Sequence, residues 1–473
     1  MTRSSPIPDT ALAALRAALG DDALKPTPAP CLQEPRDLFT GHSPWLAEPR
    51  TTAQVVKSLQ LCSAHRIPVI PYGGGTGLVG GQTDTTARAS LLLSTARLND
   101  VRRIDALDAV LVCGAGLTLH DAQQRAAEHG MLFPLSLASE GSCTVGGNLA
   151  TNAGGVNVLR YGNARALCLG VEAVLADGTV VSDLGGLRKD NTGYALSQLL
   201  IGSEGTLGII TAAALRLFPQ PQERVATLAA VPSPRAALAL LERLQQAFGE
   251  RVTAFELISH QGIAFLAETG IDHRMPLDSE SPWYVLTEVA SGPDPALGDA
   301  VATLLADAAS AELVDDAILA SNEAQRLALW HLRESIPEAN RLVGSVASFD
   351  ISVPISAIPD FIDDAQHALG ALDSRLRINC FGHVGDGNLH FNSFPPSGAS
   401  KADFRGVADD VKRTVYDLVD THGGSFSAEH GVGRQKTGQL AQYGDPGKLA
   451  AMRAIKQALD PHNLLNPGAV LPD

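Results

Sequence analysis

Apolar residues recur with the spacing of a helix in two segments near the start of the chain. Residues 9–20 (DTALAALRAALG) predict a helix that ends at a glycine. Residues 51–66 predict a second helix, because apolar residues return every three or four positions from Val55, with Thr51 or Thr52 as N-cap. The apolar run IPVIPY that follows predicts a strand. The chain therefore begins with helices and then enters a sheet.

The pattern changes further along the chain. From about residue 90 to 218, short apolar runs alternate with glycine turns, and Asp177-Gly178 between two valine-rich runs predicts a hairpin. Prolines from residue 219 onward predict a domain border. Between 235 and 375, strands such as PWYVLTEVA alternate with helices rich in alanine and leucine, which predicts helices packed on one sheet. The C-terminal tail is mostly helical, so the fold class that we expect is α+β.

Composition narrows the classes of protein that remain. The 473 residues are 45% hydrophobic and 18% charged, which predicts a globular chain of about two to three domains. A net charge of -15 argues against a nucleic-acid surface, although a local positive site can still bind an anionic substrate.

Cellular location follows from what the sequence lacks. The six cysteines form no C-x-x-C pair, which is typical of buried thiols in a reducing compartment. The N-terminus MTRSSPIPDT has no apolar core of a signal peptide, and no run of about 18 apolar residues predicts a transmembrane helix. We expect a cytoplasmic protein, with a peripheral contact to the inner membrane left open.

The densest glycine cluster is residues 71–81, PYGGGTGLVGG. Gly75, Gly77 and Gly80 satisfy G-x-G-x-x-G, but the helix precedes the strand here, so we reject a nicotinamide-binding Rossmann site. Consecutive glycines let several backbone N–H groups face one anion, and a pyrophosphate is the natural guest. The alternative is a tight turn between strands, which needs fewer glycines.

Two more glycine clusters occur at residues 139–155 and 202–210. Small residues and side-chain amides at this density allow a flat ring to lie against backbone. Three such loops together predict a long dinucleotide lying along a groove.

Histidines mark a second candidate site. His383 and His390 flank an Asp-Gly turn between two apolar runs, so a hairpin can bring them onto neighbouring strands. With Glu429 they would form a three-ligand divalent site that keeps positions open for a substrate. Spacing alone leaves an ordinary buried or surface histidine equally open.

The motifs PYGGGTGLVGG, GSCTVGGNLATNAGG, KDNTGY and GSEGTLGIIT, in this order, resemble the FAD-binding domain of the vanillyl-alcohol-oxidase-like flavoproteins. This is the p-cresol-methylhydroxylase-type (PCMH-type) domain, which has two subdomains. With the C-terminal motifs, the chain is similar to the D-lactate, D-2-hydroxyglutarate and glycolate dehydrogenase branch from about residue 36 onward. The resemblance implies an N-terminal helix and connector (1–35), the FAD-binding domain (36–218), an α+β substrate or cap domain (219–420) and a helical segment completing the flavin site (421–473).

The resemblance also implies the cofactor contacts. The pyrophosphate would lie on the first glycine loop, the isoalloxazine near the second and the adenine near the third. Because no His or Cys lies within residues 71–81, we expect non-covalent FAD. The implied FAD residues are Gly73, Gly74, Gly75, Thr76, Gly77, Leu78, Gly81, Ser142, Thr144, Gly147, Asn148, Asn152, Gly154, Glu204, Gly208, Ile210 and Asn466.

The implied reaction is oxidation of a D-2-hydroxy acid to the 2-oxo acid, with hydride transfer to flavin N5. The residues that match the branch's zinc or manganese ligands are His383, His390 and Glu429. His430 matches the base that takes the hydroxyl proton. Arg333 and Asn392 match residues that contact the substrate, although Arg333 without the resemblance would be an ordinary helix-surface arginine.

Two positions depart from the 2-hydroxyglutarate pattern. Pro337 and Ser348 stand where those enzymes carry a threonine and a lysine. Without that lysine, a monocarboxylate such as lactate becomes more plausible than a substrate with a second carboxylate.

Other readings stay open. The same fold could serve an oxidase that uses O₂, or a non-catalytic subunit of a larger glycolate-oxidase-type complex, and a zinc hydrolase would use the histidines without flavin. The electron acceptor could be an electron-transfer flavoprotein, a quinone or a cytochrome. The oligomeric state is also open, a homodimer included.

Overall fold

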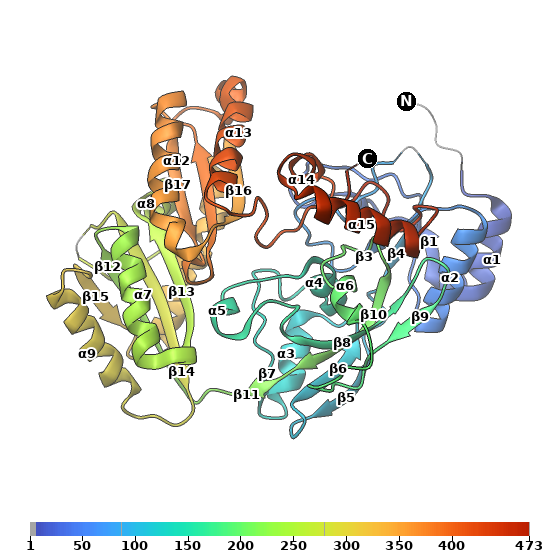
Figure 1. Cartoon of the computed structure of the whole chain (residues 1–473), viewed down its shortest axis with the longest axis horizontal. Coiled ribbons are helices and arrows are strands. Elements are labelled where there is room, and N and C mark those ends of the chain that lie inside the picture. The colour runs from blue at the N-terminus through green and yellow to red at the C-terminus, as the bar shows by residue number, and fades with distance from the viewer. Residues whose placement is uncertain (1–5, 87, 279, 473) are drawn as a thin grey trace. The chain divides into compact units, whose positions relative to one another are not determined.

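The computed structural model describes residues 6–86, 88–278 and 280–472. The chain divides into two compact units, shown in Figure 1. The first unit comprises Met1–Gly154, Gly162–Gln220 and Glu429–Asp473, and the second comprises Gly155–Tyr161 and Pro221–Ala428. The chain thus leaves the first unit twice, at Gly155 and at Pro221, and returns to it at Gly162 and at Glu429.

A four-stranded sheet opens the first unit, in the order β1-β2-β4-β3. The pairs β2–β4 and β3–β4 are parallel, whereas β1–β2 is antiparallel. Its strands are β1 (Leu24–Pro26), β2 (Trp45–Ala47), β3 (Val69–Tyr72) and β4 (Leu91–Ser94).

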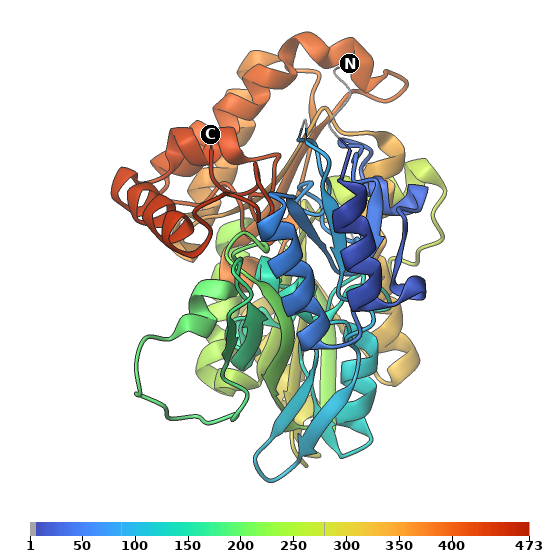
Figure 2. The ribbon, with the colours of Figure 1, turned by 90° about the vertical axis from the view of Figure 1, so that its right-hand side faces the viewer.

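Helices α1 (Asp9–Leu19) and α2 (Thr52–Ala64) pack side by side, as Figure 2 shows in blue. Leu15 and Leu59 from these helices are buried together with Val69 and Leu91 of the sheet. The side chain of Thr51 accepts a hydrogen bond from the N–H of Gln54, which settles the N-cap of the second helix. Both N-terminal helices predicted from the sequence are confirmed.

A five-stranded antiparallel sheet, in the order β5-β6-β10-β8-β9, forms the other part of the first unit. The predicted hairpin at Asp177-Gly178 joins β8 to β9, and Gly178 takes a positive φ of 88° there. The strands are β5 (Val101–Asp105), β6 (Val110–Gly114), β8 (Cys168–Val174), β9 (Val180–Ser182) and β10 (Ile209–Arg216).

The remaining elements of the first unit are shorter or C-terminal. A two-stranded sheet joins β7 to β11. These elements are β7 (Met131–Leu132), β11 (Phe218–Pro219), α3 (Leu119–Ala127), α4 (Val145–Thr151), α6 (Leu196–Leu200), α14 (Thr437–Tyr443) and α15 (Pro446–Leu459).

One seven-stranded antiparallel sheet organises the second unit, in the order β15-β12-β14-β13-β17-β18-β16. Its central strands are buried along their whole length and on both faces, so this part of the sheet is covered on both sides. The strands are β12 (Glu223–Val231), β13 (Val252–Ser259), β14 (Trp283–Ser291), β15 (Asp316–Leu319), β16 (Ala347–Ser352), β17 (Arg377–Gly382) and β18 (Asn388–Phe394).

Helices cover this sheet. One apolar cluster joins Phe265 of α8 and Ile336 of α11 to Leu286 and Ile258 of the sheet. Helices α7 and α9 pack on β12, β13 and β14 and are visible over the sheet in Figure 1. The helices are α5 (Val158–Tyr161), α7 (Pro234–Phe248), α8 (His260–Thr269), α9 (Leu297–Ser310), α10 (Glu323–Glu334), α11 (Ile336–Val343), α12 (Ile358–Leu372) and α13 (Arg405–Thr421).

The cysteines behave as the sequence predicts. All six are free thiols, and every one except Cys31 is buried. Burial raises the pKa of the Cys62 and Cys168 thiols to about 12, so they are protonated and unreactive at neutral pH.

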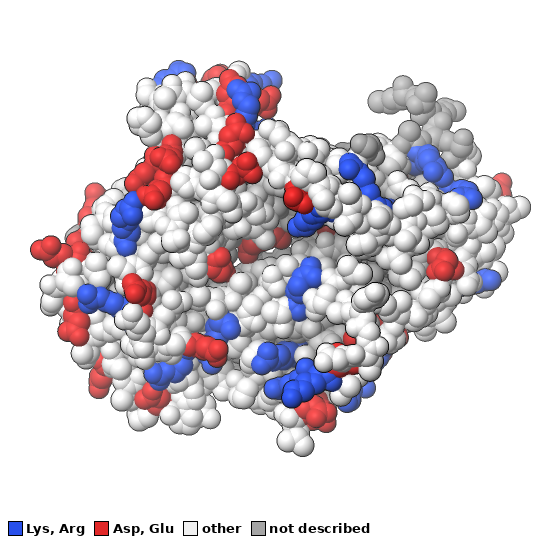
Figure 3. Space-filling view, viewed as in Figure 1, with Lys and Arg blue, Asp and Glu red and all other residues white. Residues whose placement is uncertain are grey.

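The surface carries mixed charge. On the face in Figure 3, acidic and basic side chains are interspersed among uncharged residues. Within the described residues, no helix is long and apolar enough to cross a membrane.

Candidate active site

The first glycine loop follows β3 directly and leaves a row of backbone donors. From Gly73 to Leu78, no backbone N–H donates a hydrogen bond to any residue that the structure describes. Further along, the carbonyl oxygens of Gly80 and Gly81 accept hydrogen bonds from Nη1 of Arg434 at 3.2 Å. Half-buried N–H groups without protein acceptors are what an anion needs.

The three glycine loops, far apart in sequence, pack against one another. A side chain on Gly74 would overlap the carbonyl oxygen of Ser142, in the second loop. A side chain on Gly205, in the third loop, would overlap the ring of Pro71. The second and third loops are also joined by a hydrogen bond from Glu204 N–H to the carbonyl oxygen of Ala150, at 2.8 Å. Several glycines are therefore required for loop packing as well as for the approach of a ligand.

The second loop contains a helix that the sequence did not predict. Thr144 caps α4 by accepting a hydrogen bond from Gly147 N–H, and Gly146 N–H donates to the carbonyl oxygen of Ala115. Asn152 ends the helix in the left-handed conformation, with φ at 52°. Glycine-rich local sequence has low helix propensity, so the cap at Thr144 and the long-range hydrogen bond to Ala115 stabilise the helix.

Glu204 and Asn466 tie the C-terminal segment to these loops. The buried Glu204 carboxylate accepts hydrogen bonds from the N–H groups of Val432 and Gly433, at 2.7 and 2.8 Å. Burial raises its pKa to about 7, despite those two donors. The side-chain amide of Asn466 donates to the carbonyl oxygens of Gly81 and Glu204. The Glu204 carboxylate thus holds the backbone immediately after Glu429 and His430.

The histidine hairpin lies in the second unit and forms as predicted. Strands β17 and β18 pair antiparallel, with Phe381 opposite His390, and Gly387 takes a φ of 91° in the turn. His383 follows β17 directly, and its ring centroid lies 5.7 Å from that of His390. His390 and Asn392 share one face of β18 because they are two residues apart.

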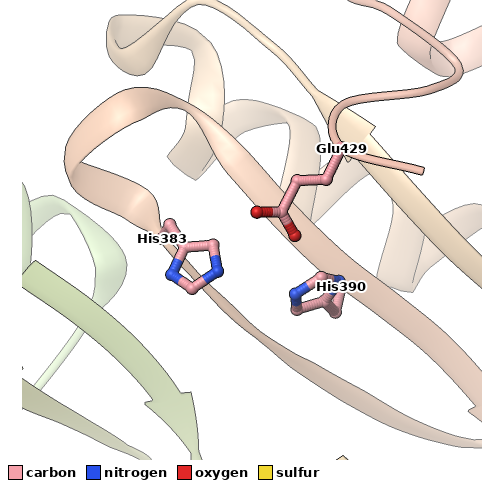
Figure 4. A group of neighbouring side chains, drawn as sticks. All are labelled: His383, His390 and Glu429. Carbon is pink, nitrogen blue, oxygen red and sulfur yellow. The ribbon is translucent and has the colours of Figure 1, made fainter. Parts of the chain in front are cut away.

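Glu429 completes the cluster. The N–H of Ala428, the residue before it, donates to the carbonyl oxygen of Asp350 at 3.2 Å. One ligand atom from each of His383, His390 and Glu429 lies within 4.8 Å of the others, and Figure 4 shows the three side chains turned toward one another. Two imidazoles and a carboxylate are ligands that a divalent zinc or manganese ion accepts.

A second group, Asp350, Glu429 and His430, also has ligand atoms within 4.8 Å of one another. Asp350 lies opposite His390 on the neighbouring strand, with 3.9 Å between its Oδ1 and Nδ1 of that histidine. His430, the candidate base, therefore lies among the residues of the candidate metal site.

Arg333 is not the surface arginine that its helix would suggest. It is buried, and its Nε and Nη2 both lie 2.9 Å from Oε2 of Glu256, on β13. The other oxygen of that carboxylate lies 2.6 Å from Nδ1 of His383. Burial alone would raise the pKa of Glu256, but His383 and Arg333 outweigh it and lower the pKa. No motif in the sequence marks Glu256, whose one local signal is a carboxylate in an otherwise largely apolar buried strand.

Protein-family models that match this chain show which kind of protein contains the glycine loops and the histidine cluster. Residues 44–183 match the family model described as FAD binding domain, and residues 220–470 match FAD linked oxidases, C-terminal domain. The chain belongs to the FAD-linked oxidases. It is therefore a flavoprotein oxidoreductase, and the first glycine loop with its row of N–H donors fits the diphosphate of FAD.

Relatives of this FAD-linked oxidase cover most of its length. It is 39% identical to the mitochondrial D-2-hydroxyglutarate dehydrogenase of Bos taurus, over 91% of this chain and 77% of that protein. It is 36% identical to the D-2-hydroxyglutarate dehydrogenase of Xanthomonas citri pv. viticola, over 97% and 96%. The structure of p-cresol methylhydroxylase with substrate bound covers 97% of this chain and 96% of that chain, with a TM-score of 0.76 at 18% identity. The PCMH-type fold predicted from the sequence is confirmed.

The other cofactor residues predicted for this FAD-linked oxidase lie around the same loops. Gly208 directly precedes β10, which contains the buried Ile210. The side-chain amide of Asn148 lies 3.5 Å from Sγ of Cys143. A side chain on Gly154 would come within 2.7 Å of Oε1 of Glu429, so glycine leaves room for that carboxylate.

Pro337 and Ser348, the two positions that depart from the 2-hydroxyglutarate pattern, lie in the second unit. Ser348 stands opposite Asn392 in the β16–β18 pair, and its hydroxyl bonds to that of Ser345 at 2.7 Å. The side-chain oxygen of Asn392 accepts a hydrogen bond from Phe349 N–H. Pro337 is in the first turn of α11.

Proposed function

We propose that this FAD-linked oxidase is a dehydrogenase that oxidises a D-2-hydroxy acid to the 2-oxo acid. The observation that carries the proposal is that the side chains of His383, His390 and Glu429 lie close together. Glu256 connects Arg333 to this group, because its carboxylate contacts both Arg333 and His383. The names of the bovine and Xanthomonas relatives support the substrate class.

The first part of the proposal concerns the bound groups. The N–H groups of residues 73–78 would hold the diphosphate of a non-covalent FAD, which would supply the acceptor for the hydride of the substrate Cα. His383, His390 and Glu429 would hold a zinc or manganese ion, which would supply a Lewis acid for the substrate hydroxyl group.

The second part concerns what the side chains do to the substrate. His430 accepts the proton of the substrate hydroxyl, since a neutral imidazole has a ring nitrogen that can act as a base. The guanidinium of Arg333 binds the carboxylate, and its position over the ring of Phe381, 4.8 Å from the centroid, restricts its motion. The side chain of Asn392 contacts the substrate from the same strand face as His390.

We further propose a monocarboxylate substrate, such as D-lactate, rather than a dicarboxylate. A second carboxylate would need a cation, and the serine hydroxyl at position 348 bonds to Ser345 instead. Pro337 offers neither a hydroxyl nor a positive charge.

Electrons leave the enzyme to an external acceptor, such as an electron-transfer flavoprotein, a quinone or a cytochrome. An oxidase that uses O₂ on the same fold is the competing function, and peroxide release under air would favour it. The zinc-hydrolase reading loses its support because the chain matches the FAD families over both units.

Anaerobic bleaching of the flavin by a panel of hydroxy acids tests this function. D-lactate should bleach the yellow colour rapidly, D-2-hydroxyglutarate more slowly, and the L-isomers should not bleach it. Bleaching by L-isomers alone, or by none of the panel, would contradict the proposal.

The variant His430→Ala is the matching side-chain test. It should remain yellow and keep its metal but bleach at least about a hundredfold more slowly, which is the usual contribution of a positioned base. Wild-type bleaching rates in this variant would exclude His430 as the base.

A further inference from the structure

Glu256 is a buried carboxylate that no motif singled out. It lies on β13, a central strand of the seven-stranded sheet, and only 1% of its surface is exposed. Both of its oxygens are engaged within the second unit. Oε1 lies 2.6 Å from Nδ1 of His383, and Oε2 accepts from Arg333 at 2.9 Å.

Stability alone does not explain this arrangement. A buried ion pair loses the hydration of both charges, and well-packed apolar residues at the same positions are often equally or more stable. The residues that share its face of β13, Ala254 and Ile258, are fully buried in an apolar cluster, so an apolar residue would suit this position. The role of the carboxylate therefore lies in the two residues that it contacts, His383 and Arg333.

The contact with His383 fixes the tautomer of that imidazole. Nδ1 donates to the carboxylate, so the proton lies on Nδ1 and the lone pair lies on Nε2. Histidines that bind metals commonly donate their other ring N–H to such a carboxylate, which orients the ring and strengthens the ligand.

The contact with Arg333 fixes the guanidinium in the same way. Nε and Nη2 point to Glu256, which leaves Nη1 outside the pair as a donor for another carboxylate. The guanidinium also stacks over the ring of Phe381, the residue two positions before His383. The Glu256 carboxylate therefore orients both a candidate metal-binding residue, His383, and a candidate substrate-binding residue, Arg333.

We infer that Glu256 is a positioning residue that sets the affinity for the metal through His383 and the affinity for the substrate carboxylate through Arg333. The inference rests on the proposed function, because it takes His383 as a metal ligand and Arg333 as a substrate ligand. It goes beyond that function by making both affinities depend on one buried side chain.

The chain offers a matched control in Glu288 on the adjacent strand β14. Its carboxylate is also buried, and it accepts from Arg326 at 2.8 Å and from the indole N–H of Trp330 at 2.9 Å. The control thus removes a buried carboxylate that pairs with an arginine in the same sheet, without touching His383.

The experiment compares Glu256→Gln with Glu288→Gln in the FAD-loaded full chain. Each protein is stripped with a chelator and titrated with Zn²⁺ alone, and the Zn²⁺ dissociation constant, KM and kcat are measured. Glu256→Gln should raise the Zn²⁺ dissociation constant about 10- to 100-fold. This is the usual loss of metal affinity when a residue that hydrogen-bonds to a metal ligand is replaced. It should also raise KM by a larger factor than it lowers kcat. Glu288→Gln should leave the dissociation constant within about twofold of the wild type, even if it melts at a lower temperature.

Two results would overturn the inference, and they are distinguishable. If the wild type binds Zn²⁺ tightly and Glu256→Gln binds it equally well, the inference is wrong while the proposed function stands. If the wild type binds no Zn²⁺, the metal part of the proposed function fails and the inference fails with it. Should Glu256→Gln fail to fold, Glu256→Asp keeps the charge but shortens the side chain by one methylene. It should raise the Zn²⁺ dissociation constant by a smaller factor, and an unchanged constant would again overturn the inference.

Discussion

The variant His390→Ala is expected to lose at least about a thousandfold in kcat/KM while it keeps its FAD. Removing one of three ligands weakens metal binding, and a metal that polarises a substrate oxygen contributes several kcal/mol, about a factor of ten for each 1.4 kcal/mol. The flavin should stay bound because His390 lies on β18 of the second unit, whereas the glycine loops belong to the first. Steady-state kinetics, the visible flavin spectrum and elemental analysis of the same sample measure all three effects.

An exposed histidine provides the control for this variant. His367 lies on α12 in the same unit, so His367→Ala should keep both activity and metal content. If His390→Ala retained wild-type metal content and more than roughly a tenth of the wild-type kcat/KM, His390 would not be a ligand of a catalytic metal.

The variant Gly74→Ala is expected to lose FAD and to unfold at a temperature several degrees lower. The added methyl group would overlap the carbonyl oxygen of Ser142 and lie 2.8 Å from Cα of Cys143. Both are backbone atoms that cannot move aside without separating the two loops. Overpacking of this kind costs about 1–3 kcal/mol or more, and the row of N–H donors from Gly73 onward would be displaced with it.

Gly141→Ala is the matched control, because it adds the same methyl group to the second loop where no atom lies within 4 Å. It should retain full flavin absorbance and the wild-type melting temperature. A yellow Gly74→Ala protein with an unchanged melting temperature would show that the close approach of the loops is not required for FAD binding.

Much of the fold could be predicted from short stretches of sequence. The cap at Thr51 and the hairpin at Asp177-Gly178 were predictable because a few neighbouring residues determine them. The hairpin that brings His383 near His390 was predictable for the same reason: its two strands are adjacent in sequence. The resemblance of the glycine motifs then identified the FAD domain, which the family match confirms.

Long-range packing could not be predicted from the sequence. Glu256 contacts His383, 127 residues later, and nothing near either residue signals the pair. A lone carboxylate in an apolar strand is a signal, but Glu288 gives the same signal and binds a different arginine. Likewise, the sequence predicts that Gly74 is a glycine only so that a ligand can approach the backbone. The structure adds a second reason, because a side chain there would overlap the carbonyl oxygen of Ser142.

The position of a bound zinc ion shows whether His383, His390 and Glu429 form the metal site. Crystals of the FAD-loaded protein soaked in Zn²⁺ would be measured at the zinc absorption edge. We expect one strong anomalous peak, about 2.0–2.2 Å from a nitrogen of His383, a nitrogen of His390 and a carboxylate oxygen of Glu429. A fully soaked crystal with zinc bound only elsewhere, and none among these three side chains, would contradict it.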